Sequence, residues 1–104
     1  MTYDDYNRLD ELSVKMSEIK VSLKDADSRL FEVRSARETL MEGLAVAVNE
    51  GGEASHIRED LFSLVRKEAV LEKEADALLD EKIDLAQAYR EFSEGLLKQA
   101  GEDQ

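Results

Sequence analysis

Asn49-Glu50-Gly51-Gly52 is the strong helix-breaking stretch of the chain, and it decides the fold. Adjacent glycines favour the left-handed backbone that ends a helix, and Gly51 is placed to satisfy the last free carbonyls. On both sides the apolar residues recur with helical spacing. We therefore expect one domain over residues 1–104 with a helix at about 3–48, a turn at 49–54, a helix at about 55–100 and a frayed tail at 101–104.

The segment before the turn carries a single apolar seam. Its members alternate between three and four residues apart, which is the a/d pattern of a coiled coil. Thr2 and Asp5 have the spacing of a capping box, so the helix should begin near Tyr3. The seam consists of Leu9, Leu12, Met16, Ile19, Leu23, Ala26, Leu30, Val33, Arg37, Leu40, Leu44 and Ala47.

The segment after the turn has a seam with the same spacing. Ser55 is the expected N-cap of this second helix, with Gly52 as the other candidate. Two seam members, Glu68 and Lys82, are charged, and we expect Lys82 to bend outward past the edge of the seam. The seam consists of Ile57, Leu61, Leu64, Glu68, Leu71, Ala75, Leu78, Lys82, Leu85, Tyr89, Phe92 and Leu96.

A short connection between two long helices favours antiparallel neighbours, so the fold class is all-α, an antiparallel coiled-coil hairpin. Counting outward from the turn places Leu30 opposite Ala75 and Arg37 opposite Glu68. Opposite charges at facing core positions can fix the register of two helices. We therefore interpret Arg37 and Glu68 as a register-setting pair.

The second helix also carries a further apolar stripe beside its seam. The members that we assign to self-association are Phe62, Val65, Ala69, Leu79, Ile83 and Ala86. A two-helix hairpin needs only one narrow seam per helix, so a wider apolar face requires another element to cover it. The simplest cover is a second copy, and we expect a homodimer that forms a four-helix bundle.

Composition narrows the classes of function. The net charge of −11 disfavours direct binding to nucleic-acid phosphates or to an anionic membrane surface. The absence of cysteine excludes disulfides and thiolate chemistry and suits the cytoplasm, where we expect the protein to reside. The polar, acidic start from Met1 to Tyr6 does not resemble a signal peptide, and the apolar run Leu44–Val48 is too short to span a bilayer.

Acidic residues recur every fourth position along the second helix, beginning at Glu68. Since Glu68 faces the core, the possible acidic binding strip consists of Glu72, Asp76, Asp80 and Asp84. Such a strip could imitate a phosphate backbone and block a nucleic-acid-binding site. The competing interpretation is that Lys24, Arg29 or Arg34 neutralises part of it.

Glu53 and His56 have the Glu-x-x-His spacing of ferritin-like di-iron bundles. The pair lies at the turn, however, and the chain has only one histidine, so a surface histidine is the favoured interpretation. No catalytic motif stands out, and we expect no enzyme, no cofactor and no metal.

The leading hypothesis is a non-enzymatic protein–protein interaction protein, such as an adaptor, assembly chaperone or regulator, that acts through a long acidic coiled-coil surface on an unidentified protein partner. The alternative is an acidic nucleic-acid mimic that inhibits a nucleic-acid-binding enzyme, as phage antagonists do. A ferritin-like metal-binding bundle is the third.

Overall fold

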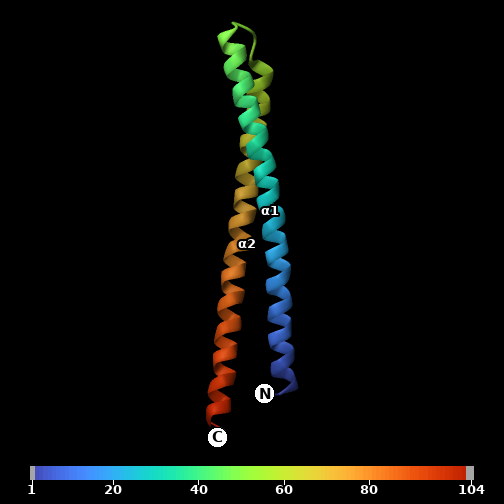
Figure 1. Ribbon diagram of the computed structural model, residues 1–104, viewed down its shortest axis with the longest axis vertical. Coiled ribbons are helices and arrows are strands. Elements are labelled where there is room, and N and C mark those ends of the chain that lie inside the picture. The colour runs from blue at the N-terminus through green and yellow to red at the C-terminus, as the bar shows by residue number, and fades with distance from the viewer. Residues whose placement is uncertain (1, 103–104) are drawn as a thin grey trace. The chain divides into compact units, whose positions relative to one another are not determined.

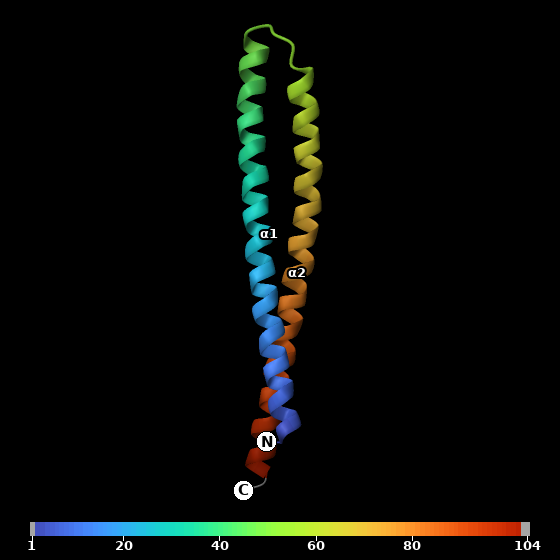
Figure 2. The same ribbon diagram turned by 90° about the vertical axis from the view of Figure 1, so that its right-hand side faces the viewer.

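The computed structural model describes residues 2–102, and over this range the protein is a hairpin of two long α-helices without a strand (Figures 1 and 2). Helix α1 spans Tyr3–Asn49 and helix α2 spans Ser55–Glu102. The predicted all-α hairpin is confirmed. Its two elements follow from the regular three-four spacing of mostly apolar residues and from the absence of proline.

Helix α1 ends at Asn49, and helix α2 continues through Gly101 and Glu102, two residues beyond the end expected from the sequence. A single glycine weakens a helix without ending it unless its backbone turns left-handed. Within residues 2–102, Gly51 is the glycine with positive φ. Asp103 and Gln104 lie outside the described residues.

The start of α1 is a capping box, as the spacing of Thr2 and Asp5 predicts. The backbone N–H of Thr2 donates to Oδ2 of Asp5 at 3.0 Å, and the backbone N–H of Asp5 donates to the Thr2 hydroxyl at 3.2 Å. The Thr2 backbone N–H, followed by the Thr2 side chain, lowers the pKa of Asp5 below its ordinary value. Asp4 and Asp5 also place negative charge at the positive end of the helix dipole.

The end of α1 is a Schellman motif built on Gly51, whose φ is 72°. The backbone N–H of Gly52 donates to the carbonyl of Ala47 at 2.9 Å, and that of Gly51 donates to the carbonyl of Val48 at 3.2 Å. These bonds satisfy carbonyls that the helix leaves free at its end. Gly51 is thus the left-handed residue that the sequence predicts.

The start of α2 differs from the prediction in its capping residue. The carbonyl of Ala54 accepts the first helical hydrogen bond, from the N–H of Arg58 at 3.0 Å, so Ala54 occupies the N-cap position and Ser55 is the first helical residue. The Ser55 hydroxyl donates instead to the Glu53 carboxylate at 2.9 Å. Ala54 is buried, which explains why a small apolar residue stands there.

Contacts divide the hairpin into two units, each with a segment of both helices. The turn unit is Asp25–Asp76, and the terminal unit consists of the described parts of Met1–Lys24 and Ala77–Gln104. Within each unit the two segments run antiparallel, since α1 and α2 are joined by one short turn (Figure 2).

The predicted seams form the packed surfaces of both helices. In α1 every seam member is buried or half-buried, and in α2 only Lys82 and Tyr89 are exposed. In the turn unit, Leu30, Val33 and Leu71 form a buried cluster against which Leu64 and Ala75 pack. In the terminal unit, Leu12 and Ile19 are the buried residues among those described.

Candidate interaction surfaces

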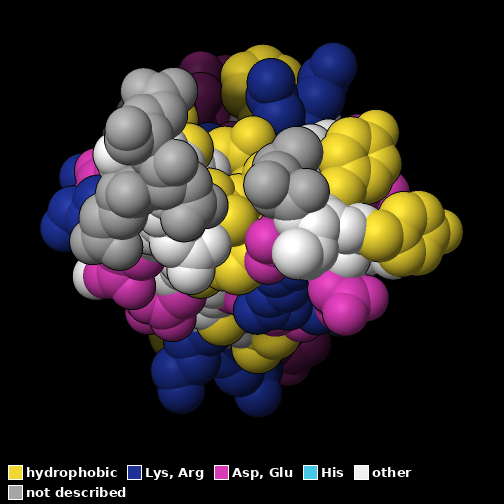
Figure 3. Space-filling model, turned by 90° about the horizontal axis from the view of Figure 1, so that it is seen from below, with side chains coloured by type: hydrophobic (Ala, Val, Ile, Leu, Met, Phe, Trp, Pro, Cys, Tyr) yellow, Lys and Arg dark blue, Asp and Glu magenta, His cyan; other side chains and the backbone are white. Residues whose placement is uncertain are grey.

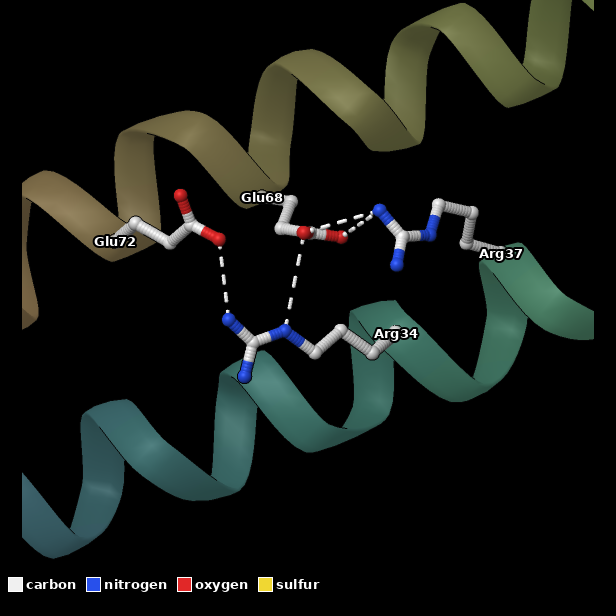
Figure 4. Close-up of polar contacts among 4 residues, drawn as sticks. All are labelled: Arg34, Arg37, Glu68 and Glu72. Carbon is white, nitrogen blue, oxygen red and sulfur yellow. Dashed lines mark hydrogen bonds and ion pairs between the residues drawn. The ribbon is translucent and has the colours of Figure 1, made fainter.

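A cluster of four charged side chains links α1 to α2 in the turn unit (Figure 4). Arg34 and Arg37 extend from α1 toward Glu68 and Glu72 of α2. The Nη1 atom of Arg37 donates a hydrogen bond to Oε1 of Glu68 at 3.0 Å and lies 2.8 Å from Oε2. The structure thus brings together the two charged residues that the count from the turn places opposite each other.

The Arg37–Glu68 pair is only partly satisfied. Glu68 is buried, whereas a third of the Arg37 side chain is exposed. Nε of Arg37 finds no hydrogen-bond acceptor among the described residues, and Oε2 of Glu68, although close to Nη1, lacks hydrogen-bond geometry. A buried pair with unmet donors contributes little net stability compared with two apolar side chains. We therefore expect the pair to select one register of the two helices rather than to add much stability.

Arg34 connects this pair to the acidic strip. Its Nη2 atom donates to Oε1 of Glu72 at 3.0 Å, and its Nε lies 3.8 Å from Oε1 of Glu68. The sequence leaves open which cation reaches Glu72, because a long side chain at the seam edge can reach several positions along the facing helix. Arg29, another candidate, pairs instead with Asp25 of its own helix at 3.2 Å.

The predicted acidic strip is therefore not uniform. Glu72 is held by Arg34, and its side chain remains half exposed. Asp76 of the turn unit is exposed, as are Asp80 and Asp84 of the terminal unit. Exposed ion pairs contribute less than about 1 kcal/mol, so Arg34 offsets the charge of Glu72 only weakly and leaves its carboxylate on the surface.

The second apolar stripe of α2 is uncovered in both units. In the turn unit Phe62 is 65% exposed, Val65 is 45% exposed, and Ala69 is exposed. In the terminal unit Leu79 is 46% exposed and Ile83 55%, while Ala86 is half-buried. These values contrast with the buried seam on the same helix.

Apolar side chains on the outer surface of α1 lie apart from one another. Val21 and Phe31 are each about 70% exposed, but polar residues separate them, and single exposed apolar residues are common on soluble proteins. Viewed from the end that carries the termini, yellow apolar side chains lie among mixed acidic and basic ones (Figure 3). The exposed patches that lie beside a packed seam with the same spacing are those of α2.

Lys82 interrupts the seam of the terminal unit. Its side chain is exposed, in accordance with the expectation that it bends outward. Together with Met16, Lys20 and Tyr89 it lines an open surface groove of about 360 Å³. Tyr89, which lines the same groove, is 37% exposed.

The residues of the proposed metal motif do not share a helix. Glu53 lies in the turn, before α2 begins, and its carboxylate accepts the Ser55 hydroxyl, while His56 is an exposed residue of the first turn of α2. In residues 2–102 no group of three or more histidine or acidic side chains is arranged to hold a metal ion.

Neither described helix combines the length and apolar character that crossing a membrane requires. Comparison of the chain with known protein families, with curated proteins and with solved structures finds no match.

Proposed function

We propose that this chain is a non-enzymatic protein–protein interaction protein that self-associates through the second stripe of α2. The supporting observation is the exposure of Phe62, Val65, Leu79 and Ile83 on a helix whose other apolar face is already packed. Glu72 and Asp76 divide this stripe into two apolar patches, and soluble proteins rarely leave large apolar patches uncovered. Adaptor, assembly chaperone and regulator are all compatible roles for such a helical surface.

The mass of the protein in solution tests self-association. Sedimentation equilibrium of the parent chain over a range of concentrations should give twice the chain mass at high concentration. The variants Val65→Lys and Ile83→Lys should shift the equilibrium toward the monomer, because each places a charge within the stripe. Val21→Lys, at a more exposed position of α1, is the control and should leave the mass unchanged. A parent chain that stays monomeric at every concentration would refute self-association.

A second candidate function, mimicry of a nucleic-acid backbone, is supported by the exposure of Asp76, Asp80 and Asp84. The ion pair between Arg34 and Glu72 counts against it, because it reduces the charge of the first member of the strip. Capture from a host lysate separates the two functions. Recovery of a nucleic-acid-binding enzyme by the parent, lost when these three aspartates become asparagine, would favour mimicry. Retention of the same partner by that variant would exclude it.

A further inference from the structure

Two short patches on α2 have mirror-image spacing. The first patch, Phe62, Val65 and Ala69, has steps of three and then four residues. The second patch, Leu79, Ile83 and Ala86, has steps of four and then three. The first belongs to the turn unit and the second to the terminal unit, and both lie on one unbroken helix. A second helix that runs in the opposite direction presents this reversed order.

Antiparallel pairing of two α2 helices places the large side chains of one patch opposite the small side chains of the other. The first patch of one copy then contacts the second patch of the other, and the reverse contact forms by symmetry. The facing pairs are Phe62 with Ala86, Val65 with Ile83, and Ala69 with Leu79 of the second copy. Large side chains meet small ones in two layers, and two β-branched side chains meet in the third, which is how packed helices fill space evenly.

Other arrangements of the same helix pair fit less well. A slip of one heptad places Val65 opposite Asp76 or Arg90, so a charge faces an apolar side chain. Parallel pairing places Phe62 against itself and Ala69 against itself, which crowds one layer and leaves another empty. The antiparallel arrangement described above avoids both faults.

The stripe also has the area that a weak dimer needs. At about 150–200 Å² for each large side chain, the exposed fractions correspond to roughly 400 Å² of apolar surface per copy. Two copies with their alanines and polar flanks bury about 1,000 Å², which is near the lower limit for a specific interface.

We propose that a second copy of this chain covers the stripe by antiparallel pairing of α2 with α2, in the register that joins the first patch to the second. This inference rests on the self-association proposed above and adds the orientation and register of the two copies.

Acidic residues lie at the centre of this arrangement. Glu72 faces Asp76 of the second copy, and the two-fold symmetry repeats the contact, so four carboxylates surround the axis. Arg34 pairs with Glu72 of its own chain, whereas Asp76 is exposed before association. Like charges repel across the interface, and salt screens this repulsion. The dimer should therefore tighten with added salt, and Asp76→Asn should tighten it by roughly tenfold, because the repulsive contact occurs twice.

Engineered cysteines test the orientation directly, since the chain contains no native cysteine. The single variants Val65→Cys and Ile83→Cys are oxidised separately and as a mixture, and the products are resolved by non-reducing electrophoresis and mass spectrometry. Antiparallel pairing predicts a disulfide between the two variants in the mixture. It predicts none in either variant alone, because two copies of position 65 lie about 27 Å apart along the helix pair. Val21→Cys is the control on α1.

The other outcomes separate this inference from self-association. Disulfides formed by each single variant alone indicate parallel pairing and overturn the orientation. A parent chain with the mass of a dimer but no disulfide in the mixture overturns the proposed face, although self-association stands. A parent chain that is monomeric at every concentration overturns both proposals.

Discussion

Gly51 carries a backbone conformation that other residues adopt only with strain. Its φ of 72° lies in the left-handed region, where a Cβ atom crowds the following carbonyl. Beyond its own residue and its two neighbours in the chain, a Cβ at this position would meet no atom within 4 Å, so the strain arises from the local backbone and not from a packed side chain. Gly43, in the interior of α1, also has open space for a Cβ but keeps a helical backbone.

Alanine substitutions at these two glycines should therefore act in opposite directions. We expect Gly51→Ala to lower the free energy of unfolding by about 1–2 kcal/mol. Gly43→Ala should raise it by roughly 0.5–1 kcal/mol, because alanine is the better helix former. Urea denaturation followed by circular dichroism measures both. Equal effects at the two positions would contradict this account of the turn.

Asp5 should make the stability of the protein depend on pH in acid. Its pKa is lowered by the Thr2 backbone N–H and side chain, so the folded state binds the proton more weakly than the unfolded state. The stabilisation is present above the unfolded pKa and is lost as pH falls through the folded pKa. The difference in stability between the parent and Asp5→Ala should shrink on acidification. A difference that does not shrink as the pH falls through the acid range would exclude the capping role.

Each helix can form from the apolar spacing of its own seam, but packing of the two helices also requires one fixed alignment, or register, between the seams. Apolar seams tolerate a slip of one heptad, because every layer meets a similar layer. Arg37 and Glu68 break this equivalence, since a slip would leave each charge against apolar side chains. We therefore propose that the pair selects the register.

Substitution of the pair should separate stability from specificity. Arg37→Leu or Glu68→Leu alone should lower the free energy of unfolding by about 1–3 kcal/mol, because each leaves a charge without its partner. The double leucine variant should recover most of that loss but populate more than one register or oligomeric state, measured by mass in solution and by cross-linking of cysteines at positions 30 and 75. Glu72→Gln, in the exposed pair with Arg34, is the control and should cost less than about 1 kcal/mol. A double variant with unchanged pairing and mass would refute the register role.

Much of the structure of the two helices can be predicted from the sequence, because it depends on the spacing of residues that are close together in the chain. The seams, the capping box and the left-handed Gly51 all follow from residue type and position. The partner of Glu72 and the cap of α2 do not. Arg34 reaches Glu72 through a flexible side chain, and the buried Ala54 occupies the N-cap position although serine is the preferred capping residue.

For the whole molecule, burial is uneven between the two units. Of the eight residues that are buried in the described chain, the turn unit holds Ala26, Leu30, Val33, Ala54, Glu68 and Leu71, and the terminal unit holds Leu12 and Ile19. The terminal unit also has the charged, exposed Lys82 at a seam position, where it lines an open surface groove.

Hydrogen exchange should show that the turn unit, which holds more buried residues, opens less readily than the terminal unit. Backbone amides near Leu30, Val33 and Leu71 should exchange more slowly than those near Met16 and Tyr89, by on the order of tenfold or more, because buried apolar contacts oppose local opening. Mass spectrometry of peptides from deuterated protein measures the rates. Equal protection in the two units would contradict the link between burial and local stability.

The position of the turn also bears on how the chain is synthesised. Residues 3–49 of α1 are synthesised before any residue of α2 exists, so their seam has no intramolecular partner at first. The first residues of α2 lie beside the last residues of α1, and only a short loop must close to join them. At about 5–20 residues per second, the wait for the residues that cover Val33 lasts only seconds. The nascent chain therefore buries its best-packed layers first and adds the terminal unit last.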